Sequence, residues 1–127
     1  MVRVAIYAKE KIILRPLEIH PGCYTIGRNP DADLVVNANQ DSGVSSNHAV
    51  ITIGQEVEAN GCIGTVRDVS SQGTFINRFR ISKTLNRSPL EVPLFEGDSL
   101  GLGQEGYSIR IPRKNATMTE PYSEVDK

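Results

Sequence analysis

Short apolar runs alternate with turn-forming residues along most of this chain. The runs are rich in β-branched residues, and no window keeps the helical spacing of apolar residues for three turns. Alternation is clearest at residues 49–53 and 107–111, where every second side chain would face a core. The pattern predicts an all-β domain with strands at residues 2–7, 12–17, 23–26, 34–36, 49–53, 64–68, 74–76, 80–82, 100–102 and 107–111.

Residues that set turn geometry separate these runs, at His20-Pro21-Gly22, Arg28-Asn29-Pro30-Asp31, residues 37–43, Ala59-Asn60-Gly61 and Glu96-Gly97-Asp98. Many short strands with such separators favour a sandwich or a barrel over a parallel sheet. After Pro112 the chain is charged and polar, with few large apolar side chains. We therefore predict one β domain at residues 1–112 and a polar, flexible tail or linker onset at residues 113–127.

Length and charge narrow the class of protein. A chain of 127 residues is one ordinary domain, long enough to bury a core without a metal or a disulfide. The 14 Lys and Arg residues nearly balance the 15 Asp and Glu residues, so the net charge is −1. Neither sign forms a long block, so we expect no nucleic-acid partner and no membrane partner.

The two cysteines and the N-terminal residues carry no signal of their own. Cys23 and Cys62 lack any C-x-x-C spacing, so no metal, cofactor or redox site is predicted, although one disulfide between them stays open. Residues 2–8 are apolar, but the charged residues 9–11 end that run well short of a signal-peptide core. We expect an intracellular protein.

Three polar clusters lie at the ends of predicted strands, at Gly27-Arg28, residues 45–48 and residues 71–77. A phosphate ester brings about two negative charges and three strong acceptor oxygens. A pocket for it needs a guanidinium, hydroxyl donors and backbone N–H groups from turns. Arg28 and Ser45 have the required chemistry.

These clusters resemble the forkhead-associated (FHA) domain over roughly residues 2–111. Five matches occur in the family's order, namely Gly27-Arg28, the acidic turn into a strand at residues 31–36, Val-Ser-x-x-His-Ala-x-Ile at residues 44–51, Asp-x-x-Ser-x-Gly-Thr-Phe-x-Asn at residues 68–77, and Gly97-Asp98. The resemblance implies a β-sandwich of about eleven strands whose loops at one end bind phosphothreonine in an extended partner segment.

The resemblance also implies a role for each matched residue. The residues expected at the phosphothreonine are Arg28, Ser45, Ser46, Ser71 and Gln72. His48 is expected to brace the binding loops, and Asn77 to steady a neighbouring turn. Gly27 and Gly73 occupy positions where a Cβ would crowd a tight backbone.

Three positions depart from the family pattern. Ser46 stands where Arg, Lys or Asn is usual, Gln72 stands where Asn is usual, and Arg78 replaces the glycine that usually follows Asn77. Gln is one methylene longer than Asn, so its amide reaches a different place at a higher entropic cost. A charge-assisted hydrogen bond contributes about 1.5–3 kcal/mol. The departures therefore predict binding weakened by about two orders of magnitude or more.

No catalytic residue is predicted. His20 precedes Pro21 in a turn and His48 has a bracing role, so neither is paired with a nucleophile. Residues 101–106 match G-x-G-x-x-G, but a strand is predicted to follow them where a dinucleotide site needs a helix, so they predict a hairpin.

The resemblance implies a non-catalytic interaction domain for phosphorylation-dependent signalling, with phosphorylated protein segments as partners. It favours a nuclear protein in the DNA-damage response, similar in layout to the N-terminal part of a checkpoint mediator. The alternative is a degenerate FHA domain that acts mainly as a homodimerisation module with little phosphothreonine binding, which Ser46, Gln72 and Arg78 favour. The candidates for the pairing surface are strands exposed at the edges or faces of the sandwich.

Overall fold

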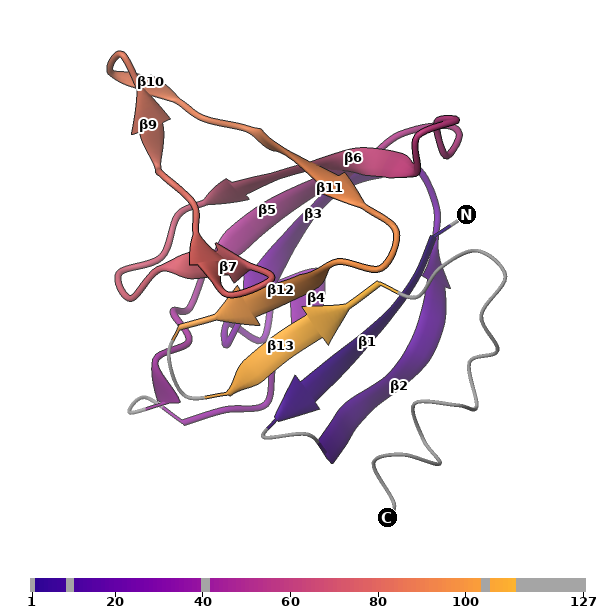
Figure 1. Cartoon of the computed structure of the whole chain (residues 1–127). Coiled ribbons are helices and arrows are strands. Elements are labelled where there is room, and N and C mark those ends of the chain that lie inside the picture. Colours follow the sequence, from indigo (N-terminus) through magenta and orange to yellow (C-terminus); the bar gives the residue numbers. More distant parts are fainter. Residues whose placement is uncertain (1, 9–10, 40–41, 104–105, 112–127) are drawn as a thin grey trace.

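The computed structural model describes residues 2–8, 11–39, 42–103 and 106–111, with side chains from Ile19 onward. Two sheets pack face to face as a β-sandwich (Figure 1). The first sheet has the order β2-β1-β13-β12-β7-β8 and the second has the order β11-β6-β5-β3-β4, so that together they hold the expected eleven strands. No helix among the described residues is long and apolar enough to cross a membrane.

The strands are short, and every pairing is antiparallel except that of β3 with β4. The strands are β1 (Val2–Ala8), β2 (Lys11–Ile19), β3 (Gly22–Gly27), β4 (Leu34–Val35), β5 (Ala49–Ile53), β6 (Cys62–Asp68), β7 (Thr74–Ile76), β8 (Phe79–Arg80), β9 (Thr84–Leu85), β10 (Ser88–Pro89), β11 (Val92–Phe95), β12 (Ser99–Leu102) and β13 (Tyr107–Arg110). The predicted domain limit at residue 112 and the predicted tail at residues 113–127 lie outside the described residues.

The core lies between the inner faces of the two sheets. In β5, Ala49, Ile51 and Ile53 are buried and the two residues between them are partly exposed, as the alternation predicted. Leu100 in β12 and Ile109 in β13 lie opposite each other and are fully buried in the core. Since each such Leu or Ile side chain contributes about 1.5–3 kcal/mol on burial, these layers hold the loops at the ends of the strands in place.

Three strands were not predicted. β9 and β10 form a separate hairpin that projects from the sandwich (Figure 1), and β11 lies at the edge of the five-stranded sheet. Pro93 interrupts the apolar pattern of β11, and an edge strand tolerates proline because one row of its N–H groups needs no partner. The strand predicted at residues 80–82 lies earlier, because the β7–β8 turn places β8 at Phe79–Arg80.

An Asn-Arg turn closes each of two hairpins, β7–β8 and β9–β10. Asn77 and Arg78 link β7 to β8 with φ of 49° and 76°, and Asn86 and Arg87 link β9 to β10 with φ of 52° and 69°. Two-residue hairpin turns with positive φ at both positions favour Asn followed by Gly. Arg78 therefore occupies the left-handed position where the sequence pattern led us to expect glycine.

Replacing Arg78 or Arg87 with glycine is expected to raise the free energy of unfolding by roughly 0.5–1 kcal/mol each. The left-handed conformation costs a residue with a Cβ roughly 1–2 kcal/mol, and glycine avoids this cost. The greater freedom of glycine in the unfolded chain offsets part of that gain in stability. Urea unfolding measures the change. Arg80→Gly is the control: Arg80 lies in β8 without positive φ, so there glycine should destabilise. A loss of stability in either turn variant would contradict the assignment of strain.

Candidate functional site

The three polar clusters meet at one end of the sandwich. The backbone N–H of Arg28 donates to the carbonyl of Ser45 at 3.1 Å. The Ser45 hydroxyl accepts a hydrogen bond from the N–H of Ser71 at 3.1 Å, and the two serine hydroxyl oxygens are 3.3 Å apart. Residues from the ends of β3, from the segment before β5 and from the segment before β7 thus form one hydrogen-bonded surface.

Arg28 is held at this surface by its own side chain. It is half-buried, and its Nε donates to the carbonyl of Val44. A guanidinium carries five N–H donors, and this bond uses one of them. The contact therefore fixes the position of the positive charge beside Ser45.

Gly27 allows the backbone segments to approach each other. A Cβ on Gly27 would lie 2.0 Å from the carbonyl oxygen of Ser46, a distance that no side chain tolerates. Gly73 is buried with φ of 101°, and a Cβ there would lie 2.9 Å from Nε of Arg80. Both glycines are therefore required by backbone geometry.

His48 joins two of the loops from inside the protein. It is fully buried, its Nδ1 accepts from the N–H of Ser45 at 3.0 Å, and its Nε2 lies 2.9 Å from the carbonyl oxygen of Gly73. Since a carbonyl only accepts, Nε2 carries the proton and the ring is neutral. Burial lowers the pKa of His48 and outweighs the hydrogen bond to Gly73 and the charge of Asp68.

Asp68 organises the loop before β7. Its Oδ1 accepts from the N–H and hydroxyl of Ser70 at 2.9 and 2.6 Å and from the hydroxyl of Thr74 at 2.7 Å. The Ser70 hydroxyl in turn accepts from the N–H of Gly73 at 2.8 Å. Desolvation raises the pKa of Asp68, but the bonds from Ser70 and Thr74 together hold it below its usual value.

Asp68 and Ser70 were not among the predicted site residues. The signal that points to them is the Asp-x-Ser spacing, since an aspartate often bonds the backbone two residues ahead of it in a turn. Both are buried, and they hold the exposed Ser71 and Gln72 at the surface. Their role is therefore to shape the loop from beneath.

The remaining predicted residues separate into two places. Ser46, Ser71 and Gln72 are exposed on the loops around Arg28. Asn77 lies at the other end of β7, where its amide donates to Asp98 at 2.9 Å and accepts from the N–H of Ser99 at 3.0 Å. Asn77 thus braces the turn before β12, as a residue that steadies a turn should, and is not part of the loop surface.

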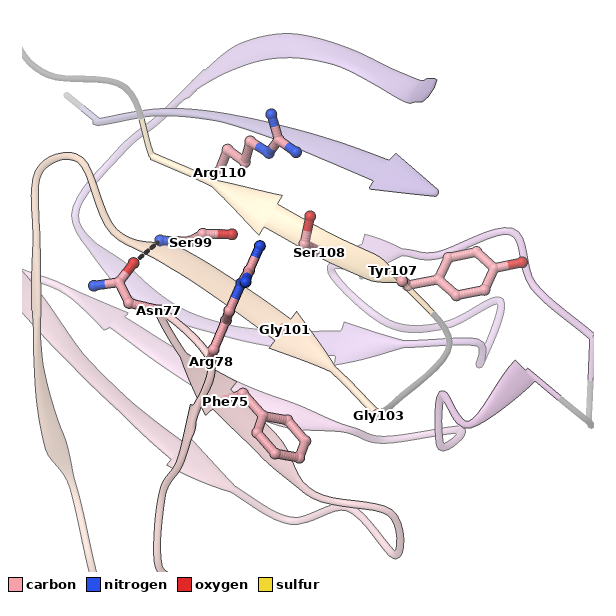
Figure 2. A pocket seen from close by; sticks show the side chains of 10 residues that line it. Phe75, Asn77, Arg78, Ser99, Gly101, Gly103, Tyr107, Ser108 and Arg110 are labelled. Atoms are coloured by element: carbon pink, nitrogen blue, oxygen red, sulfur yellow. Dashed lines mark hydrogen bonds between the residues drawn. The ribbon is translucent and has the colours of Figure 1, made fainter. Parts of the chain in front are cut away.

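A separate groove of about 670 Å³ lies over β7, β12 and β13 (Figure 2). Its lining residues are Phe75, Asn77, Arg78, Ser99, Gly101, Gly103, Gly106, Tyr107, Ser108 and Arg110. Gly101 and Ser108 face away from the core, because the buried Leu100 and Ile109 alternate with them. The groove contains none of the residues predicted to contact phosphate, which needs convergent donors more than volume.

Acidification is expected to destabilise the fold in two steps. The native state keeps His48 neutral, so between its lowered pKa and the ordinary histidine pKa of 6.5 the unfolded chain binds more protons, and stability falls as the pH falls. Asp68 stabilises the fold fully at a pH above 3.8, the ordinary pKa of an aspartate. This stabilisation is lost as the pH drops through the lower pKa that Asp68 has in the folded protein. Urea unfolding across pH about 7.5 to 3 measures both steps. His48→Gln should remove the upper step, and an unchanged upper step would contradict its assignment to His48.

Comparisons with known proteins agree with the geometry. A family model described as FHA domain matches residues 24–103. The crystal structure of the FhaA FHA domain, complexed with the intracellular domain of Rv3910, is 23% identical, covers 87% of this chain and 99% of that chain, and has a TM-score of 0.62. The N-terminal FHA domain of S. cerevisiae Rad53p, in complex with a phosphothreonine peptide, is 20% identical, with coverage of 91% and 95% and a TM-score of 0.63.

The FHA domain of the CT664 protein from Chlamydia trachomatis is 20% identical, with coverage of 87% and 94% and a TM-score of 0.63. At these identities the structural likeness shows the fold alone. No curated protein matched the chain.

Proposed function

This chain belongs to the FHA family, and from that premise we propose that the end of the sandwich carrying Arg28 binds a phosphothreonine in an extended segment of a partner protein. The observation that carries the proposal is the convergence of Arg28, Ser45 and Ser71 through the hydrogen bonds described above. FHA domains are interaction modules without catalysis of their own, and we propose the same for this chain.

The donors suit a phosphate. The Ser45 hydroxyl oxygen accepts from the N–H of Ser71. In the bond between the two hydroxyls either oxygen can donate, so the proton of one of them can point to a phosphate oxygen while the other donates within the pair. Arg28 adds a guanidinium beside it, and the exposed Ser46 and Ser71 add shorter donors. Structures of the same fold hold such ligands: the Rad53p domain holds a phosphothreonine peptide, and the MEK1 FHA domain holds the HOP1 pThr318 peptide.

We propose that Gln72 weakens this site. It is exposed one residue before the buried Gly73, where its amide would face the backbone of a bound segment. Gln72→Asn is expected to tighten binding roughly fivefold to thirtyfold, because the shorter side chain loses less freedom and gains a bond worth about 0.5–1.5 kcal/mol. Calorimetric titration of wild type and variant with one panel of phosphothreonine peptides measures the change.

The same panel tests the proposal itself. Phosphothreonine peptides should bind, whereas the peptides with unphosphorylated threonine should not. If no phosphothreonine peptide binds either protein, the proposed function is wrong. If both proteins bind with equal affinity, the function stands and the role given to Gln72 is wrong.

The second candidate function is self-association as a homodimer. β8 is the edge strand of the six-stranded sheet among the described residues and its Phe79 is 77% exposed, while Leu85 on the next hairpin along the chain is 60% exposed. An edge strand beside exposed apolar side chains is a template for pairing. A dimer mass in light scattering that Phe79→Ser reduces to a monomer mass would support this function, and a monomer at all concentrations would exclude it.

We place this activity in nuclear DNA-damage signalling, as part of a larger scaffold. The support is the family membership together with the Arg28 surface, which suits partners that a kinase has phosphorylated. Imaging of the tagged protein before and after DNA damage tests the setting. A protein that stays outside the nucleus under both conditions would remove this part of the proposal and leave the binding activity untouched.

A further inference from the structure

The outer face of the six-stranded sheet carries the groove of about 670 Å³ described above (Figure 2). Phe75, Gly101 and Ser108 form one row across β7, β12 and β13, because Gly101 lies opposite each of the other two. Gly101 has no side chain, so nothing rises between Phe75 and Ser108 in that row. The middle of the groove is therefore a floor of bare backbone with an aromatic ring at its side.

Two arginines lie at one end of this groove. Arg110 is opposite Ser99, which is two residues from Gly101 along β12. Arg78 extends from the β7–β8 turn toward the same row (Figure 2), and it forms no hydrogen bond or ion pair with the described residues. Among the described residues no acidic one lines the groove. The lining of this end thus contributes two positive charges and no negative charge.

A segment of the same chain has the complementary charge. Residues 115–126 contain no Lys or Arg and three acidic residues, Glu120, Glu124 and Asp126. The last described residue is Ile111, directly after Arg110, so the segment is joined to the cationic end of the groove. The nine residues from Ile111 to Glu120 span at most about 32 Å, whereas the four residues of β13 span about 13 Å. The connection is therefore long enough to turn back over the sheet.

We propose that residues 120–122 dock in this groove of their own chain. The Glu120 carboxylate lies at the end formed by Arg78 and Arg110. The Tyr122 ring covers Gly101. The proposal is independent of phosphothreonine binding, because the groove contains none of the residues proposed to contact phosphate. A partner protein that uses this face of the sheet would first have to displace the segment.

The spacing of the segment matches that of the sheet. In an extended chain, side chains two residues apart lie on one side, about 6.6–6.8 Å from each other. Glu120 and Tyr122 have this separation, and so do Ser99 and Gly101 in the floor of the groove. Glu120 precedes Pro121, and a proline favours an extended backbone in the residue before it. An extended segment therefore brings the carboxylate to the arginines when the ring lies over Gly101.

NMR of the full chain tests the contact directly. A Tyr122 ring over Gly101 should shift the Gly101 Hα signals upfield and give nuclear Overhauser contacts from the ring to Gly101 and Phe75. Tyr122→Ser should remove both effects, which also separates them from any effect of Tyr107 in the same groove. Unchanged amide signals from the buried residues of β5 show that each variant remains folded.

An exchange of charges tests the place of Glu120. Arg78→Glu and Glu120→Arg each bring like charges together, so each should lower the docking equilibrium constant about threefold to tenfold, measured from the Gly101 shifts. The double variant restores opposite charges and should recover most of the loss. Arg87→Glu is the matched control, since Arg87 is exposed in the same kind of turn but lies outside the groove, and it should change nothing. Added salt should weaken docking in wild type.

Three results would overturn the proposal. Gly101 signals that are the same in wild type and Tyr122→Ser would show that the segment does not occupy the groove. In a mixture of isotope-labelled and unlabelled chains, contacts only between the two kinds would assign the groove to the segment of a second copy. A double variant no better docked than Arg78→Glu would remove Glu120 from this place. Failure of phosphothreonine peptides to bind would contradict the proposed function and leave this proposal intact.

Discussion

Arg28→Ala is expected to weaken the binding of phosphothreonine peptides at least about a hundredfold. The guanidinium is the cation at the centre of the site, and each charge-assisted hydrogen bond to a phosphate contributes about 1.5–3 kcal/mol. Two such bonds correspond to a factor of about one hundred or more in the dissociation constant. Calorimetric titration of wild type and variant with one phosphothreonine peptide measures the loss.

Arg28 also supports the loop, so the stability of the Arg28→Ala protein must be measured together with its affinity for the peptide. Its Nε donates to the carbonyl of Val44, and alanine removes that bond along with the charge. Arg28→Lys keeps the charge but not the planar fork, and should bind with intermediate affinity. Arg87→Ala is the control for loss of an exposed arginine and should leave affinity unchanged. A folded Arg28→Ala protein with wild-type affinity would refute the site.

Asp68→Ala is expected to lower the free energy of unfolding by about 3–5 kcal/mol. The substitution leaves the N–H and hydroxyl of Ser70 and the hydroxyl of Thr74 without their acceptor in a buried place. Each buried donor left unsatisfied costs about 1–3 kcal/mol. Such a loss is a large part of the roughly 5–15 kcal/mol that stabilises an ordinary domain. Urea unfolding at neutral pH measures it.

Two variants sharpen this result. Asp68→Asn keeps an acceptor at the position of Oδ1, so it should cost less than alanine does. Glu56→Ala removes an exposed acidic residue and should change stability by no more than about 0.5 kcal/mol. If Asp68→Ala is no more harmful than Glu56→Ala, the Asp68 hydrogen bonds do not hold the loop.

Phosphopeptide binding should also weaken in Asp68→Ala, even where the protein remains folded. Ser71 and Gln72 reach the surface from a loop that the hydrogen bonds of Asp68 and Ser70 hold together. Without those bonds the loop would pay an ordering cost when a ligand binds. The effect would appear as a loss of affinity that low temperature partly restores.

Only some of the strands carry a residue pattern that predicts them. β5 has the bounds that the residue pattern predicted, because side chains in a half-buried strand alternate with a period that is visible locally. β7 also has its predicted bounds, residues 74–76, although its burial does not alternate. β11 was not predicted because Pro93 is unusual within a strand and is tolerated here only at a sheet edge. β9 and β10 were not predicted because their residues are all exposed and show no alternation of buried and exposed side chains.

The sequence by itself determined the all-β class, the family and the chemistry available at the loops, since turn residues, alternation and the Gly-Arg and Ser-x-x-His clusters are local features. Only the tertiary structure decided which of them meet. The contact of Ser45 with Ser71 spans 26 positions of the chain, and that of His48 with Gly73 spans 25. The packing of the two sheets creates these contacts and places Arg80 over Gly73, and no local pattern predicts them. The support from Asp68 is different, because its bonds to Ser70 span two positions and follow a local Asp-x-Ser spacing.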